Sequence, residues 1–179
     1  MDSDETGQAP SPGDGRDWTA DVAEILQDWH QRCYAAQSAH YASADRCRRL
    51  NYIIGVPAIV FASVVGTTIF AGLERDSPRA LAVASISILA AVLTGLQTFL
   101  RFSERAAQHA KAADWYSAIR RDIEQTLHLP VEFRGAAKDC LDKVRKEMNR
   151  LGQDAPELSI RSWTREAKRF GVKEPRSRV

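Results

Sequence analysis

Residues 52–100 read YIIGVPAIVFASVVGTTIFAGLERDSPRALAVASISILAAVLTGLQTFL. The stretch contains two runs without a charged side chain, 52–73 and 80–100. A hydrocarbon core about 30 Å thick needs roughly 20 helical residues, and each run meets that length. A charge near the centre of a membrane helix costs roughly 2.5–3.5 kcal/mol, so the lack of charge is informative. The stretch therefore predicts two membrane-spanning helices joined by a short loop over 74–79.

The alternative is a buried helical hairpin inside a soluble protein. Two helices that are apolar on every side would then need enough amphipathic chain to wrap them, and the remaining chain is largely charged. Outside the hairpin the chain is rich in Ala, Arg, Lys, Glu and Asp and shows no strand alternation. We therefore expect an all-α integral membrane protein, with the hairpin extended into the cytoplasm by long helices and followed by two further cytosolic helices.

The chain divides into one domain over 17–170 between two tails. Residues 1–16 are rich in Asp, Ser, Gly and Pro and predict a disordered tail, and 171–179 form a basic tail. The expected elements are a cytosolic helix over 17–51 capped by Asp17 or Thr19, spans over 52–73 and 80–100, a cytosolic helix over 101–127, a helix over 131–151 that stops at Gly152, and a basic amphipathic helix over 157–170.

The charges that flank the spans predict their orientation. Three arginines precede the first span, and Arg101, Arg105 and Lys111 follow the second. The two arginines of the connecting loop are offset by Glu74 and Asp76. The positive-inside rule then places both termini in the cytoplasm and the loop outside. No secretory signal peptide precedes the first span, so it is expected to act as its own insertion signal.

Small residues recur every fourth position in both spans, a pattern that lets membrane helices approach closely. They could pack the two spans of one chain together or pack neighbouring protomers. The rows are Ala58, Ala62 and Gly66 in the first span, and Ser87, Ala91 and Gly95 in the second.

A polar stripe follows one side of the second span. At 100° per residue its members lie within about 80° of each other, with Gln97 beside them. The stripe could line a water path in an oligomer, or its hydroxyls could bond their own backbone in a dry bundle. The stripe comprises Ser87, Ala91, Thr94, Thr98 and Arg101, and the pore-lining candidates are Ser87, Thr94, Gln97 and Thr98.

Two further features lie where the first span meets the cytosolic helices. Pro57 removes one helical hydrogen bond and predicts a bend, which is either a gating hinge or a fixed kink. Folding the chain at the loop pairs positions whose numbers sum to roughly 153, so His40 faces Ala113, about one turn from His109. The two histidines could form a proton-sensitive or metal-binding contact, or an ordinary polar contact.

The last predicted helix carries a basic face. Its expected apolar side is Ile160, Trp163, Ala167 and Phe170. Such a helix could lie on anionic lipid, could bind a negatively charged ligand or nucleic acid, or could dock on the protein with a solvated basic face.

Catalytic and metal-binding patterns are missing from the sequence. It contains no GxSxG, HExxH, Walker or CxxC motif, and its carboxylates fall on exposed helical faces. Cys33, Cys47 and Cys140 form no metal-type pair and are expected to be reduced thiols. We expect no enzymatic activity, no cofactor, no metal site and no specific nucleic-acid partner.

The order of short motifs along 17–170 resembles the SLATT family, the two-helix membrane effector domains associated with bacterial nucleotide-signalling conflict systems. The resemblance rests on small and aromatic residues. These are His40-Tyr41, RLNYIIGVP over 49–57, VGT over 65–67, Arg101-Phe102, Glu104, Ala107, His109, Tyr116, Ile119, Arg121, and APEL over 155–158 before a Trp-bearing helix.

The resemblance implies a homo-oligomeric pore in the bacterial inner membrane that acts in anti-phage defence by killing the infected cell. Two spans per chain cannot enclose a water path, so a tetramer or larger ring is expected. The chain carries no recognisable sensor or nucleotide-synthase domain, so a trigger must come from a separate sensor protein, a nucleotide second messenger, or the cytosolic helices. The alternative function is a membrane-anchored scaffold that recruits a cytosolic partner to the inner leaflet.

Overall fold

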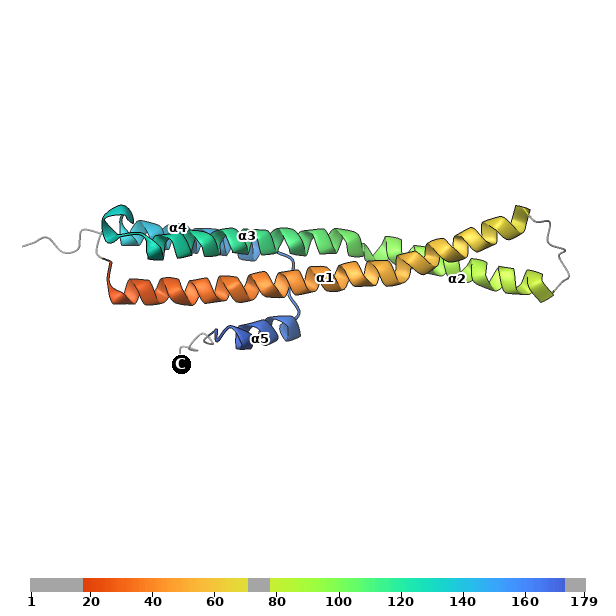
Figure 1. Ribbon diagram of the computed structural model, residues 1–179, viewed down its shortest axis with the longest axis horizontal. Coiled ribbons are helices and arrows are strands. Elements are labelled where there is room, and N and C mark those ends of the chain that lie inside the picture. Colours follow the sequence, from red (N-terminus) through yellow and green to blue (C-terminus); the bar gives the residue numbers. More distant parts are fainter. Residues whose placement is uncertain (1–17, 71–77, 173–179) are drawn as a thin grey trace, which may run out of the picture.

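The computed structural model describes residues 18–70 and 78–172. This part of the chain is helical and contains no strand, which confirms the all-α prediction. The predicted tail over 1–16, loop residues 74–77 and tail residues 173–179 lie outside the described residues. The elements are α1 (Ala20–Phe70), α2 (Pro78–Leu100), α3 (Phe102–His128), the 3₁₀ turn η1 (Val131–Phe133), α4 (Ala137–Asp154) and α5 (Ile160–Arg169) (Figure 1).

Helix α1 forms a single 51-residue rod. The Thr19 hydroxyl accepts a hydrogen bond from the Val22 backbone N–H at 3.3 Å and so caps the first turn, as one of the two predicted caps. The helix continues without interruption through Pro57, and in Figure 1 its axis turns where the ribbon changes from orange to yellow. Pro57 therefore bends α1 without ending it.

Two helical stretches are long and apolar enough to cross a membrane, one in the second half of α1 and one beginning in α2. Only 11% and 6% of their most apolar windows are buried inside the protomer. A core helix of a soluble protein would be mostly buried, so this argues against the soluble alternative. We call residues 52–70 of α1 together with α2 the apolar half of the molecule, and the rest the polar half.

The predicted helix over 101–127 is wrong at its start, because Arg101 breaks the helix. Arg101 has φ 48° and ψ 41°, in the left-handed region, and α3 begins at Phe102. The break changes the direction of the chain between α2 and α3. Helix α2 crosses α1, whereas α3 runs beside α1 (Figure 1). Pro78 and Arg79, which the sequence placed in the loop, belong to α2, since proline is well tolerated in a first helical turn.

The core of the polar half lies between α1, α3 and α4. Leu26 and Cys33 of α1 pack with Ile119 and Ile123 of α3, and all four are 5% exposed or less. Apolar residues recur at four-three spacing in the predicted helix over 131–151, from Phe133 to Leu151, and supply the third wall of this core, except that Phe133 lies in η1 and is exposed. The members Ala137, Val144 and Leu151 are buried, and Leu141 and Met148 are partly buried.

The beginning of α4 differs from the prediction, since it starts at Ala137 and not at residue 131. Arg134 turns back and donates to the carbonyls of Leu127 and Leu129, at 2.9 and 2.6 Å, which satisfies the end of α3. Gly135 follows with φ 72°, and the Trp18 indole N–H donates to its carbonyl at 3.0 Å. This turn separates η1 from α4. Helix α4 then runs past Gly152 to Asp154.

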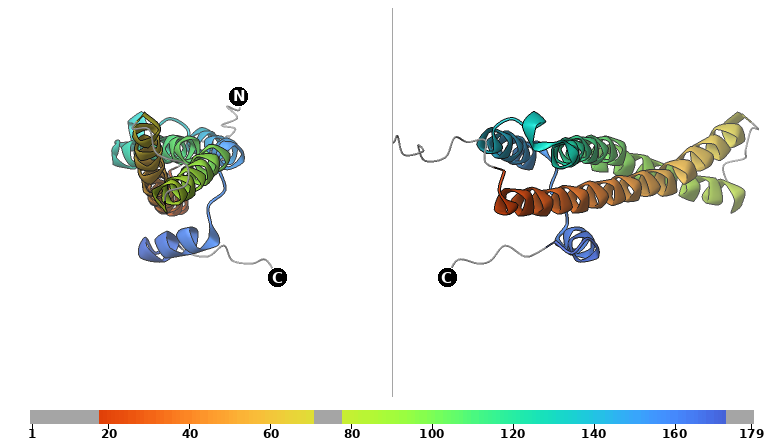
Figure 2. Two further views of the ribbon diagram at one scale, coloured as in Figure 1. Left: turned by 90° about the vertical axis from the view of Figure 1, so that its right-hand side faces the viewer. Right: turned by 60° about the vertical axis from the view of Figure 1, so that its left-hand side comes forward.

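Helix α5 packs on α1, on a side that α3 leaves free (Figure 2). It begins at Ile160, three residues later than predicted, because Ser159 caps it by accepting from the Ser162 backbone N–H. The predicted apolar side is wrong in part. Ile160 is 83% exposed, whereas the polar residues Ser162 and Glu166 are 6% exposed. The Ser38 hydroxyl of α1 donates a hydrogen bond to the Glu166 carboxylate, which explains why this polar residue is buried.

Candidate functional site

The two apolar stretches meet at one crossing point. Gly55 of α1 is buried there, and a Cβ atom on it would lie 2.8 Å from Nε2 of Gln97 on α2. The same Nε2 donates to Oδ1 of Asn51 at 3.4 Å. Gln97 therefore faces α1 within the hairpin, although its sequence position made it a pore-lining candidate.

Beyond the crossing, α1 and α2 diverge toward their far ends (Figures 1 and 2). Ala58 is 3% exposed, so one member of the small-residue rows packs inside the protomer. A Cβ atom on Gly66 or Gly95 would meet nothing within 4 Å. Ala62, Ala91 and Gly95 are exposed and Gly66 is half-buried. The remaining packing candidates are thus not enclosed within the described part of the protomer.

The hydroxyls of the polar stripe bond their own helix. Ser87 donates to the carbonyl of Val83, Thr94 to that of Ala90, and Thr98 to that of Thr94, at 2.8–3.0 Å. Thr94 and Thr98 are exposed and Ser87 is half-buried. Each oxygen keeps a lone pair that can accept from water or from another helix. Thr94 and Thr98 thus lie on an exposed flank of α2, and Ser87 lies in a half-buried position.

The structure brings His40 and His109 together in the polar half. Their Nδ1 atoms are 3.0 Å apart, and the ring of His40 stacks on Tyr116 with centroids 5.6 Å apart. His40 is 2% exposed. The predicted register placed His109 a turn from His40, and the observed contact is direct.

Burial of both rings and their closeness to each other disfavour protonation of the histidine pair. Burial, followed by His109, lowers the pKa of His40 from 6.5 to about 4, and burial lowers the pKa of His109. A hydrogen bond between two Nδ1 atoms needs one of them protonated as a donor and the other bare as an acceptor. Among the described residues, no group of three or more His, Cys, Asp or Glu side chains could hold a metal ion.

Three polar contacts between helices were not predicted. The Tyr41 hydroxyl donates to Oδ1 of Asp114 at 2.5 Å, and the Ser38 hydroxyl donates to Oε2 of Glu166 at 2.9 Å. Tyr116 stacks on His40. The Tyr41 contact joins positions that sum to 155, so the hairpin register could have found it. The hairpin register does not relate Ser38 to Glu166, because Glu166 lies in α5, beyond the connections that follow α3 and α4.

Comparison with known proteins returned no match: no protein-family model, no curated protein and no solved structure matches this chain.

Proposed function

We propose that this protein is an oligomeric membrane protein whose two spans pack against those of neighbouring copies and enclose an ion-conducting pore. The observation that supports it is the uncovered small-residue surface of the apolar half. Gly66 and Gly95 have open space where a side chain would lie. Membrane helices associate through such surfaces, because small residues let backbones approach closely and pack without a hydrophobic driving force.

The polar stripe favours an ion-conducting path and not a bundle with a purely structural role. Thr94 and Thr98 lie exposed on α2, next to the small-residue surface that holds Ala91 and Gly95. Packing of copies along that surface would bring the hydroxyls of neighbouring α2 helices toward a common axis. Two spans cannot surround water, so the proposal requires a ring of four or more copies.

The proposal includes an orientation and a setting. Arginines at both boundaries of the apolar half, such as Arg49 and Arg105, favour cytoplasmic termini by the positive-inside rule. The resemblance to the SLATT family extends the proposal to a bacterial inner-membrane effector of anti-phage defence, whose opening kills the infected cell.

Native mass in nanodiscs, followed by ion leakage from proteoliposomes, tests the proposal. We expect a ring of at least four copies, and we expect Thr94→Leu to reduce leakage at least ten-fold without changing the mass. Ser85→Leu is the matched control. Ser85 also bonds its own helix, through the Leu81 carbonyl, but it lies nine positions from Thr94, about 180° around α2. A monomer or dimer, or equal leakage in both variants, would contradict the pore.

A membrane-anchored scaffold is the second candidate. Large side chains are uncovered in the polar half, with Val131 53%, Phe133 73% and Trp115 40% exposed. Trp115 also borders an open groove of about 270 Å³ between α3 and α4, lined in part by Glu147 and Arg150. Such surfaces are typical of protein contacts. A four-helix dimer in nanodiscs that conducts no ions would favour this candidate.

A further inference from the structure

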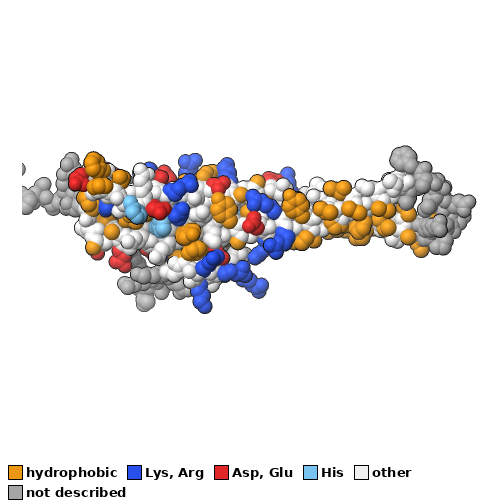
Figure 3. All heavy atoms as spheres, viewed as in Figure 1, with side chains coloured by type: hydrophobic (Ala, Val, Ile, Leu, Met, Phe, Trp, Pro, Cys, Tyr) orange, Lys and Arg blue, Asp and Glu red, His pale blue; other side chains and the backbone are white. Residues whose placement is uncertain are grey.

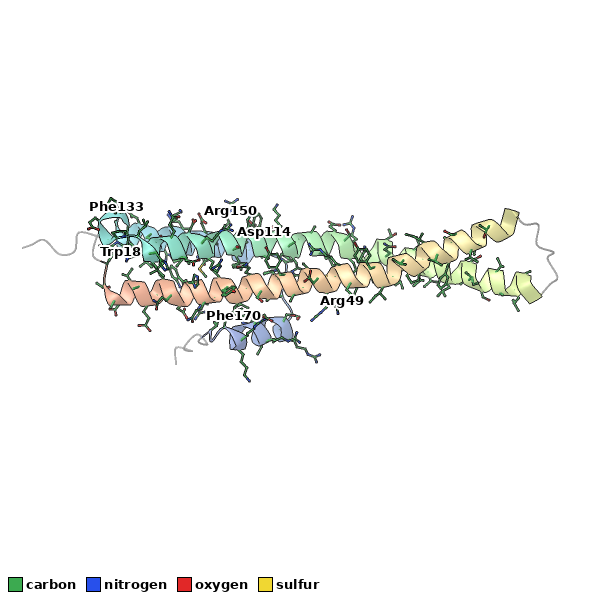
Figure 4. The ribbon with its side chains drawn as sticks, viewed as in Figure 1. Trp18, Arg49, Asp114, Phe133, Arg150 and Phe170 are labelled. Carbon is green, nitrogen blue, oxygen red and sulfur yellow. The ribbon has the colours of Figure 1, made fainter. Side chains whose placement is uncertain are left out.

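Helix α5 turns its only carboxylate inward. Glu166 accepts a hydrogen bond from Ser38 at 2.9 Å and lies 3.7 Å from the Arg169 guanidinium. The Phe170 ring lies on Tyr34, with centroids 4.4 Å apart (Figure 4). These contacts fix which side of α5 meets α1. The exposed surface of α5 consequently carries cations without a carboxylate among them, namely Arg161, Arg165, Lys168 and Arg169.

The same side of α1 is basic between α5 and the apolar half. Arg49 follows Ser38 by eleven positions, which places it only about 20° around the helix and about 17 Å farther along it. Arg46 lies on this side as well, one turn earlier. The carboxylate of this surface, Asp45, is already paired with Arg48 at 3.1 Å.

We call Arg46, Arg49, Arg161 and Arg165 the basic corner. All four side chains are exposed, and none has an ion-pair partner among residues 18–70 and 78–172. In Figure 3, blue side chains gather over α5 and the adjoining part of α1, and none is seen on the face of residues 52–67 and 80–100 turned toward the viewer. Figure 4 shows Arg49 on the side of α1 that faces α5.

The Arg49 end of the corner lies at the level of the lipid headgroups if the apolar half spans a membrane. Arg49 precedes Tyr52, the first residue of the uncharged run, by three positions or about 5 Å. The headgroup layer adds about 5–8 Å to each side of the hydrocarbon core. The end of α5 that carries Arg161 is the end nearer the apolar half (Figure 1). Arg49 thus lies in the zone of the lipid phosphates. Helix α5 docks at Ser38, 14 positions or about 21 Å before Tyr52, so its arginines extend the basic surface from that zone into the polar half, with Arg161 nearest to the membrane.

We propose that the basic corner binds the headgroups of anionic lipids, with α5 held on α1 as its second wall. Guanidinium groups bind phosphate through paired hydrogen bonds, and the anionic inner leaflet attracts basic residues within a Debye length of its surface. The proposal rests on membrane insertion, which belongs to the proposed function. The closeness of the corner to the apolar half favours lipid over nucleic acid, because a bilayer around the spans would crowd a duplex away.

Native mass spectrometry of the detergent-solubilised full chain, titrated with phosphatidylglycerol or phosphatidylcholine of equal acyl chains, tests this. We expect tighter binding of phosphatidylglycerol, and we expect Arg161→Gln with Arg165→Gln to weaken it roughly ten-fold or more. The matched control is Arg145→Gln with Arg150→Gln, two exposed arginines on α4. Arg46 and Arg49 are left intact because they also set the orientation of the first span.

Equal binding of both lipids, or an equal loss in the control variant, would overturn the proposal. Tighter binding of a double-stranded DNA oligonucleotide than of phosphatidylglycerol, lost in the Arg161 and Arg165 variant, would assign the corner to nucleic acid instead. A ring that conducts ions without a lipid preference rejects this inference alone. A chain that does not enter nanodiscs rejects the proposed function.

Discussion

The Nδ1 atoms of His40 and His109 lie 3.0 Å apart between α1 and α3, inside the polar half and away from the apolar stretches. When both rings are neutral, one Nδ1–H can donate to the bare Nδ1 of the other ring, whereas protonation of both rings would place two cations in contact in a buried position. The contact therefore stabilises the pairing of the two helices most strongly while both rings are neutral. This contact makes the pairing of α1 and α3 sensitive to acid.

We predict that the polar half loses stability as the pH falls from about 6.5 to about 4. The folded protein lowers the pKa of His40 from 6.5 to about 4, so the unfolded chain binds more protons within this window. The stabilising contribution is complete above pH 6.5 and is lost progressively below it, by up to about 3 kcal/mol. Chemical unfolding in detergent at a series of pH values measures the slope.

Carboxylates also titrate in this range, so the comparison must be made between variants. His40→Gln combined with His109→Gln keeps a polar pair but removes the titration, and we expect it to flatten the slope. His128→Gln, at the exposed end of α3, is the control and should keep the wild-type slope. If the double variant kept the wild-type dependence of unfolding free energy on pH, the histidine pair would not be the cause of that dependence.

Arg101 is predicted to be strained. An L-residue in the left-handed region costs roughly 1–2 kcal/mol, and glycine avoids this cost. Arg101→Gly and Arg101→Ala both remove the exposed ion pair with Glu104, so their difference isolates the backbone. We expect the glycine variant to be the more stable by about 1 kcal/mol in detergent unfolding.

The sign of the stability difference between Arg101→Gly and Arg101→Ala distinguishes a left-handed residue from a helical one. Inside a regular helix, glycine is less stable than alanine by roughly 0.5–1 kcal/mol. A more stable alanine variant would therefore mean that α2 and α3 form one continuous helix at Arg101, as the sequence alone predicts.

Helical periodicity and the antiparallel register of the hairpin predicted the contact region of His40 and His109 and the buried face of α4 in the polar half. The short loop sets an antiparallel register, and that register brought His40 within a turn of His109. The four-three spacing of Val144 and Leu151 correctly gave the face that α4 buries. These predictions depend only on neighbours along one helix or across one hairpin.

The parts that the sequence did not predict depend on contacts between distant segments. The left-handed Arg101 follows from the need to carry α2 across α1, and no glycine or proline marks it. The helical wheel of α5 favoured burying Ile160. Glu166 is buried instead because the Ser38 hydroxyl, 128 positions away in the sequence, donates a hydrogen bond to its carboxylate. A single-helix pattern contains no information about such a partner.

The Ser38–Glu166 hydrogen bond is predicted to hold α5 in place. A ten-residue helix is marginal alone in water, so its order depends on docking. Ser38→Ala leaves a buried carboxylate short of a donor and should cost about 1–3 kcal/mol of docking free energy. We expect amide hydrogen exchange in α5 to accelerate by ten-fold or more, with exchange in α3 unchanged.

Ser43→Ala is the matched control for this prediction, because the Ser43 hydroxyl donates to its own helix, to the carbonyl of Ala39. Equal exchange rates of α5 in the two variants would indicate that the aromatic contact of Phe170 with Tyr34 holds the helix by itself.

The two kinds of glycine in the apolar half are predicted to respond differently to the same substitution. A Cβ on Gly55 would lie 2.8 Å from the Gln97 amide, whereas a Cβ on Gly95 meets open space. Gly55→Ile should therefore displace the Gln97 amide from its place against α1, break its hydrogen bond to Asn51 and destabilise the hairpin, with partial rescue by Gln97→Ala.

Gly95→Ile should leave the hairpin intact and block only the approach of a neighbouring copy. Unfolding in detergent and native mass in nanodiscs separate the two effects. We expect Gly55→Ile to lower stability, and Gly95→Ile to lower the mass at wild-type stability. If Gly95→Ile retains the full ring, α2 does not pack through this surface, and the small residues of the second span must face lipid.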